Sequence, residues 1–88
     1  MASTFDIQVV TPEKIVYSGE ATSAIVPAAD GYLGLLAHHA PLLAALGKGT
    51  LTVRTPEGTH RWQIRGGLLE VHANTACVLT EELLTEGS

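Results

Sequence analysis

Residues 50–67 read TLTVRTPEGTHRWQIRGG, and this stretch predicts a β-hairpin. Before the turn, Leu51 and Val53 alternate with threonine and arginine; after it, Trp62 and Ile64 alternate with arginine and glutamine. A period of two places one face of each strand in a core. Between the two runs, the sequence TPEG is typical of a type I turn with proline in the second place.

The register of this hairpin follows from the same pattern. If Thr55 pairs with Gly58 across the turn, Leu51 faces Trp62, and the apolar faces of the two strands coincide. A slip of one residue would turn the arginines into the core, so the pairing is strongly specified. The glycine pair at 66–67 predicts a sharp bend of the backbone after the second strand.

Short strands are expected on both sides of the hairpin. At the start of the chain, Phe5, Ile7 and Val9 alternate with polar residues and predict one buried face. Further strands are expected at Lys14–Tyr17, Ala24–Val26, Leu69–His72 and Cys77–Leu79, with a turn at Ala73-Asn74. Short strands separated by turn residues at regular intervals are typical of an antiparallel sandwich or barrel. The expected fold class is therefore all-β.

Residues 30–43, DGYLGLLAHHAPLL, fit neither the strand period nor the helix period. Their two glycines and one proline argue against both structures. We therefore expect a loop from Pro27 through Gly34, and a segment that exposes apolar groups for a partner to cover. The following residues, Ala40–Gly47, are rich in leucine and alanine and are expected to form a short bend of one or two helical turns.

Length and charge exclude several classes of protein. The 88 residues fit one domain, and three of the nine acidic residues fall within the last eight positions. We expect residues 1–80 to form the β-sandwich domain and residues 81–88 a short acidic tail with at most one helical turn. The chain has no basic field for nucleic acid, and no apolar run approaches the roughly 20 residues that span a bilayer.

The sequence contains no recognisable constellation for catalysis, a cofactor or a metal. His38 and His39 are adjacent, so in an extended chain they point to opposite sides, and the other two histidines have no ligand at a suitable spacing. Gly31-x-x-Gly34 lacks the lysine of a phosphate-binding loop, and the scattered serines suggest no triad. Cys77 has no basic neighbour and is expected to be an inert, buried thiol.

The arginines of the hairpin share one face. Arg54, Arg61 and Arg65 all point away from the predicted core. Two interpretations stay open: a solvated outer face of a half-buried sheet, or a patch that meets an acidic partner.

Several ordered segments together resemble one family. They are Val9-Val10-Thr11-Pro12-Glu13, Tyr17-Ser18-Gly19-Glu20-Ala21, Ile25-Val26-Pro27, Asp30-Gly31-Tyr32-Leu33-Gly34-Leu35-Leu36, His39-Ala40-Pro41-Leu42 and Gly66-Gly67-Leu68-Leu69-Glu70-Val71. In order and approximate spacing they resemble the epsilon subunit of F-type ATP synthases, called delta in mitochondria. Three positions depart from the family pattern. Ala37 and His38 stand where the family has a proline and a small or acidic residue, and Arg65 replaces a small polar residue.

The resemblance implies a β-sandwich of about ten short strands and a function without catalysis. The chain would be a rotor subunit that links the gamma shaft to the c-ring and couples proton flow to ATP synthesis. It would bind no cofactor and would be peripheral to the cytoplasmic face of a bacterial inner membrane. Many family members add a two-helix hairpin; without it, we expect a short form that binds no ATP.

The resemblance also implies contact residues. Carried over by motif, those expected at the c-ring are Gly31, Tyr32, Leu33, Gly34 and His39, and those expected toward gamma are Leu42, Leu43, Ala44 and Arg65. The alternative function is a stand-alone β-sandwich module that binds a ligand.

Overall fold

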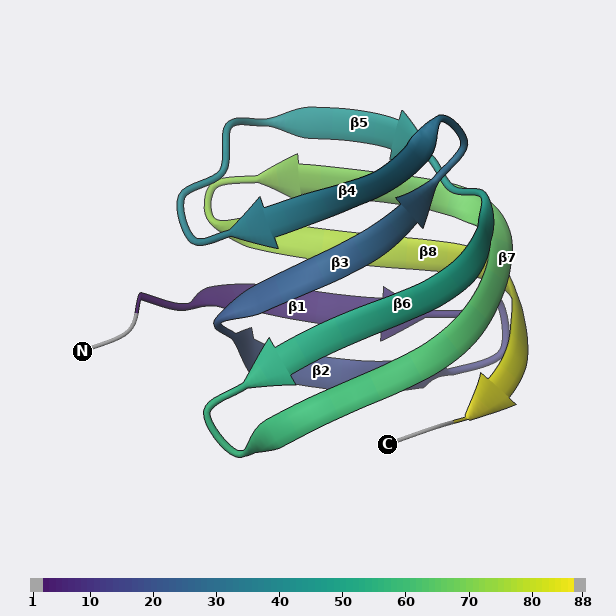
Figure 1. The fold of residues 1–88 in the computed structure, drawn as a ribbon, viewed down its shortest axis with the longest axis horizontal. Coiled ribbons are helices and arrows are strands. Elements are labelled where there is room, and N and C mark those ends of the chain that lie inside the picture. Colours follow the sequence, from purple (N-terminus) through teal and green to yellow (C-terminus); the bar gives the residue numbers. More distant parts are fainter. Residues whose placement is uncertain (1–2, 87–88) are drawn as a thin grey trace.

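The computed structural model describes residues 3–86, and within this range the molecule consists of strands (Figure 1). The eight described strands are β1 (Phe5–Val10), β2 (Ile15–Ala21), β3 (Ser23–Ala28), β4 (Gly31–Leu36), β5 (Leu42–Ala45), β6 (Lys48–Thr55), β7 (Gly58–His72) and β8 (Thr75–Glu86). Their hydrogen-bonded order is β2-β1-β8-β7-β6-β3-β4, and β5 pairs with β7. The all-β prediction is confirmed.

Two long strands belong to both layers of the sandwich. The first half of β7 and the end of β8 continue the layer of β6, β3 and β4, here called the β3 layer. The second half of β7 pairs with β5, and the first half of β8 pairs with β1, which pairs with β2; this is the β1 layer (Figure 1). The eight described strands are slightly fewer than the ten that were expected, because β7 and β8 each run through both layers as one continuous strand.

The bend that joins the layers lies at the predicted glycine pair. Gly66 has φ 70° and Gly67 has φ 119°, values that residues with a side chain rarely adopt. A Cβ on Gly67 would collide with the carbonyl oxygen of Leu79 on the neighbouring strand. The buried Thr80 hydroxyl donates to the Gly66 carbonyl at 3.0 Å and fixes the bend from inside.

The hairpin has the predicted register. Thr55 pairs with Gly58 and Leu51 with Trp62, and both inward-facing side chains are buried. Phe5 and Ile7 of β1 are buried as the alternation predicted. The core lies between the layers and contains side chains from both.

The loop expected from Pro27 through Gly34 is wrong. Residues 31–36 form β4, which pairs with β3 around a turn at residues 29–30. A proline fits within β3 because pairing with β6 ends at Ile25, so the missing N–H of Pro27 removes no ladder bond there. The Pro27 carbonyl still accepts from the Gly47 amide at 2.9 Å. The segment does expose apolar side chains, as expected: Tyr32, Leu36 and Leu43.

The helical turns expected in Ala40–Gly47 are also wrong, and residues 81–86, for which at most one helical turn was expected, are extended. Leu42–Ala45 is strand β5, which pairs with the second half of β7. Strand β8 crosses the expected domain limit at residue 80 and runs to Glu86, opposite Trp62. The last two residues of the expected acidic tail, 87 and 88, lie outside the described residues.

Candidate functional site

A continuous row of apolar side chains crosses the outer face of the β1 layer. Its members come from five neighbouring strands, and each lies opposite the next across the sheet: Ala45 faces Leu68, Leu68 faces Leu79, Leu79 faces Val10, and Val10 faces Ile15. We call these five residues the apolar row. Ile15 is 59% exposed, Leu79 42% and Leu68 38%. Side chains directly opposite on one sheet face lie in contact range, so the row is one surface.

The rows beside the apolar row are more polar. In the adjacent row, Leu43 lies opposite Glu70, which faces Cys77. Leu43 is 66% exposed and extends the apolar surface to the edge strand β5. Farther along the same face, Asp6 lies opposite Glu20. An apolar stripe with a polar and acidic rim has the anatomy of a protein interface.

Cys77 is a half-buried thiol on this face. Burial raises the pKa of the Cys77 thiol, and the nearby Glu70 carboxylate raises it further. Both effects disfavour the reactive thiolate, but the thiol is half-buried and not buried as expected.

The outer face of the β3 layer carries positive charge. Four of the five lysine and arginine residues of the chain alternate outward on β6 and β7: Lys48, Arg54, Arg61 and Arg65. The Arg65 guanidinium donates to the Glu82 carboxylate on β8. Within residues 3–86, no ion pair forms at Lys48, Arg54 or Arg61.

Tyr32 projects from the same face. Its ring reaches from β4 over β3 to β6, where its hydroxyl accepts a hydrogen bond of 3.1 Å from the Thr50 amide. The ring passes over Gly49, at which a Cβ would collide with the tyrosine hydroxyl. The tyrosine is therefore positioned, although it is 59% exposed.

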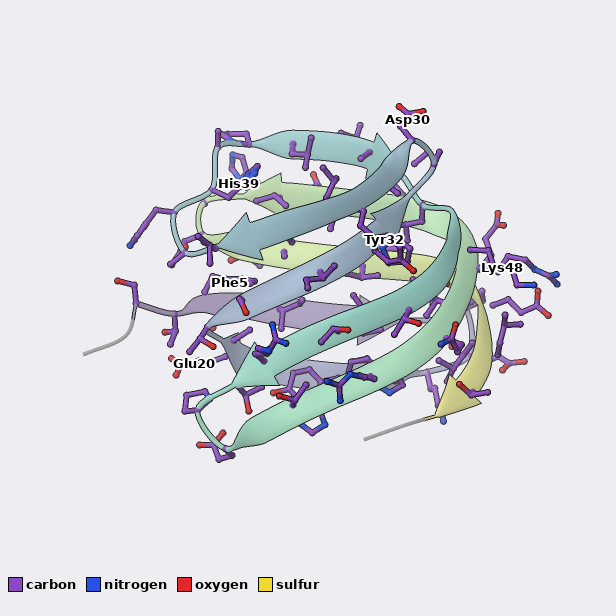
Figure 2. The ribbon with its side chains drawn as sticks, viewed as in Figure 1. Phe5, Glu20, Asp30, Tyr32, His39 and Lys48 are labelled. Atoms are coloured by element: carbon purple, nitrogen blue, oxygen red, sulfur yellow. The ribbon has the colours of Figure 1, made fainter. Side chains whose placement is uncertain are left out.

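The residues expected at the c-ring do not form one cluster. Gly31 begins β4, whereas His39 follows its far end, so the two lie at opposite ends of that strand; Figure 2 shows Asp30 and His39 at these ends. Tyr32 and Gly34 point outward from the β3 layer, whereas Leu33 is half-buried against the core. The His39 ring nitrogen Nδ1 lies 2.7 Å from the Ala40 carbonyl oxygen, a local contact.

The residues expected toward gamma are also divided. Leu43 projects outward beside the apolar row, while Leu42 and Ala44 alternate inward and are half-buried. Arg65 lies on the outer face of the other layer, at the bend of β7. Only Leu43 of this set belongs to the apolar surface.

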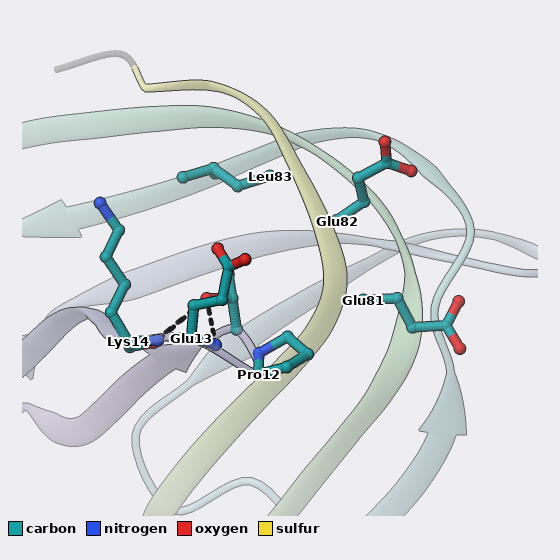
Figure 3. A pocket seen from close by; sticks show the side chains of 7 residues that line it. Pro12, Glu13, Lys14, Glu81, Glu82 and Leu83 are labelled. Atoms are coloured by element: carbon teal, nitrogen blue, oxygen red, sulfur yellow. Dashed lines mark hydrogen bonds between the residues drawn. The ribbon is translucent and has the colours of Figure 1, made fainter.

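The hollows of the described surface are shallow and contain no recognisable reaction centre. One of about 350 Å³ lies between the β1–β2 turn and β8, with Glu13, Lys14 and Glu82 among its lining residues (Figure 3). Thr11 organises its floor by accepting from the Lys14 amide at 3.2 Å. Another, of about 440 Å³, separates β4 from β5. Within residues 3–86, no three potential metal ligands come together, and no helix could cross a membrane.

The apolar row was missed by sequence reasoning because its members are scattered along the chain. Of its five residues, only Leu68 belongs to a family motif beside which a contact residue, Arg65, was expected. The available signal was the outward parity of Leu68 and Leu79, two large apolar residues at positions where a half-solvated sheet normally has polar ones. Their alignment with Val10 and Ile15 depends on strand order, which the alternation pattern does not contain.

Comparison with known proteins places these features in a family context. Residues 4–86 match the family model described as ATP synthase, Delta/Epsilon chain, beta-sandwich domain. An ATP synthase epsilon chain of Leptospira borgpetersenii is 42% identical over 80 residues, which cover 91% of this chain and 63% of that relative. One of Chlorobium limicola is also 42% identical over 80 residues and is covered to 91% of its length.

Solved structures with the same fold come from mitochondrial ATP synthases. A chain of the Euglena gracilis enzyme, in a structure of its OSCP, F1 and c-ring, matches with a TM-score of 0.84 at 19% identity over 92% of this chain and 52% of its own. A chain from the central stalk and c-ring of the Tetrahymena thermophila enzyme matches with a TM-score of 0.75 at 21% identity, covering 90% and 64%. The chain thus spans about 63% of the length of the Leptospira relatives.

Proposed function

Because the chain belongs to the Delta/Epsilon family of ATP synthase chains, as its β-sandwich domain, we propose that it is a non-catalytic subunit of the central stalk. In this function it links the gamma shaft to the c-ring and helps to couple proton flow to ATP synthesis. It is held at the membrane only through the complex, on the cytoplasmic face in a bacterium.

The apolar row is the observation that carries this proposal, and we assign it to the gamma contact. Its exposed leucine and isoleucine side chains gain about 25 cal/mol for each Å² that a partner removes from water. A stable contact of this kind buries roughly 1,200–2,000 Å² in total, so the neighbouring Leu43 and its rim would be covered as well. Of the four residues expected toward gamma, we therefore assign only Leu43 to this contact.

The c-ring contact is assigned to the end of the molecule that carries the β3–β4 turn. Asp30 and Gly31 form this end, next to Tyr32 and Leu33. His39 lies at the other end of β4 and is left out of the contact. The body between the two contacts is suited to transmit torque because β7 and β8 run through both layers without interruption.

The test replaces Leu79, at the centre of the apolar row, by glutamate. The side chain is partly exposed, so the isolated Leu79→Glu chain should fold normally. Gamma binding should weaken roughly a hundredfold, because an unpaired charge left in an interface costs about 2–5 kcal/mol. Co-purification with gamma and ATP-driven proton pumping by the assembled enzyme measure the effect.

Leu84→Glu is the matched control. Leu84 is 37% exposed and lies at the bulge of β8, away from the apolar row. This variant should bind gamma and couple like the parent chain. If Leu79→Glu also binds gamma normally, the assigned face is wrong; if the parent chain itself does not bind gamma, the alternative of a stand-alone ligand module gains ground.

A further inference from the structure

Gly34 has no structural reason to be glycine. It lies inside β4 and pairs with Ile25 without a register shift. Its φ is outside the region that favours glycine, and a Cβ built on it would meet no atom within 4 Å. A glycine in a strand interior weakens the strand, and it otherwise marks a bulge, a tight bend or the close approach of another backbone. The first two are absent here.

The missing side chain leaves a gap between apolar neighbours. Tyr32 and Leu36 flank Gly34 on the same face of β4, 59% and 66% exposed. Across the gap, Ile25 of β3 is 37% exposed. A polypeptide that passes over Gly34 would touch all three side chains.

Positive charge lies on the same face, two to three strands from this gap. The row that begins with Gly34 and Ile25 continues through Thr52 to Arg61. Arg54 lies two residues beyond Thr52 on β6, so the two arginines stand on adjacent rows. Alternate residues of an extended chain lie roughly 7 Å apart, which allows successive outward carboxylates to reach adjacent rows. The opposite outer face has the reverse charge, with Asp6, Glu20 and Glu70.

We propose that this face seats an acidic segment of a neighbouring polypeptide. We call the surface formed by Ile25, Tyr32, Gly34, Leu36, Lys48, Arg54 and Arg61 the Gly34 face. The partner's backbone passes close over Gly34, its apolar atoms contact Ile25, and its carboxylates pair with Arg54 and Arg61. Tyrosine and arginine, which interfaces favour, both belong to this face. A polypeptide fits better than a lipid surface because a one-residue gap admits a backbone.

The first experiment measures the contact in the assembled ATP synthase and rests on the proposed function. A zero-length carbodiimide reagent couples an amine only to a carboxylate in direct contact, and Lys48 is the amine of the Gly34 face. We expect Lys48 to couple to an aspartate or glutamate of another subunit. Lys48→Arg should lose the product while keeping the charge. Coupling of Lys48 only to its own chain would overturn the proposal.

Gly34→Val tests the role of the missing side chain. Because the site is open and valine favours strands, the Tm of the isolated variant should be equal to or above that of the parent. In the assembled enzyme, the intersubunit Lys48 product should fall about tenfold. Thr59→Val, on the same layer beside the β6–β7 turn, should leave the product unchanged. A Gly34→Val chain that couples like the parent would contradict the proposal.

A second experiment uses the chain alone, so its result is independent of assembly. The chain is titrated with a synthetic peptide of alternating glutamate and alanine, and backbone NMR shifts are followed. Shifts at Ile25 and Gly34 that disappear in Arg54→Glu/Arg61→Glu, but persist in Lys14→Glu, support the proposal. Shifts spread evenly over both faces, or tighter binding to phosphatidylglycerol vesicles than to the peptide, would overturn it.

Discussion

Tyr32 of β4 and Gly49 of β6 lie against each other across β3. The tyrosine ring occupies the space above residue 49, and its hydroxyl satisfies the Thr50 amide at 3.1 Å. A tyrosine exposed at 59% would be expected to move freely, yet this hydrogen bond holds it against the sheet. Residue 49 is therefore glycine for a steric reason, because the tyrosine leaves no room for a side chain. Gly34, in the same layer, has no such neighbour.

Gly49→Ala should displace Tyr32 and weaken the fold. The new Cβ would lie 2.9 Å from the Cβ of Pro27 and would collide with the tyrosine hydroxyl. Losing the bond to the Thr50 amide and repacking the ring should cost roughly 1–3 kcal/mol, measured by urea unfolding. Gly34→Ala adds the same methyl group in open space and should cost nothing. Equal stability of the two variants would show that the ring is not positioned as described.

Strand β7 is the element on which the architecture depends. It runs for 15 residues through both layers and turns at Gly66 and Gly67. Its partner β8 follows the same bend, where Thr80 is buried and donates to the Gly66 carbonyl. Without this bend, the two halves of the strand could not pair with β6 and β5 in separate layers.

Gly67→Ala should be strongly destabilising. The residue has φ 119°, and its Cβ would collide with the backbone carbonyl of Leu79, which cannot move without breaking the β7–β8 ladder. We expect a loss of roughly 3 kcal/mol or more in the free energy of unfolding. Gly58→Ala, on the same strand with φ 155° and no atom within 4 Å, should cost about 1 kcal/mol. Thermal unfolding of both variants is the measurement. A larger loss of stability in Gly67→Ala would show that the close contact with Leu79, and not the positive φ alone, sets the cost.

The elements that sequence reasoning predicted correctly are those whose pattern is local. The β6–β7 hairpin carries its register in the parity of Leu51 and Trp62, and the bend carries its own glycines. Strand β5 was not predictable in this way. Its leucines and alanines favour a helix locally, and only pairing with the second half of β7 makes them extended. The same holds for β4, whose glycines suggested a loop although its ladder with β3 is regular.

At the scale of the whole molecule, the two outer faces differ in chemistry. The apolar row with its acidic rim covers the β1 layer, and the Gly34 face with its arginines covers the β3 layer. The arginine face was visible in the sequence, because its residues alternate along one hairpin. The apolar row was not, because Val10, Leu68 and Leu79 become neighbours only when β1, β7 and β8 pair. The residues expected at the c-ring and toward gamma fall on different faces and ends of the molecule for the same reason, because strand pairing decides where each residue lies.

The central claim is that gamma covers the outer face of the β1 layer, and Cys77 tests it without any substitution. It is the single cysteine of the chain and lies on that face, opposite Glu70 and one row from the apolar row. Because burial raises the pKa of the Cys77 thiol, the rate of maleimide labelling is best measured at mildly alkaline pH, by mass spectrometry of this chain. Labelling in the assembled ATP synthase should be at least about tenfold slower than in the free chain, the ratio that ~1.4 kcal/mol of protection produces. Equal rates in the two states would contradict the account.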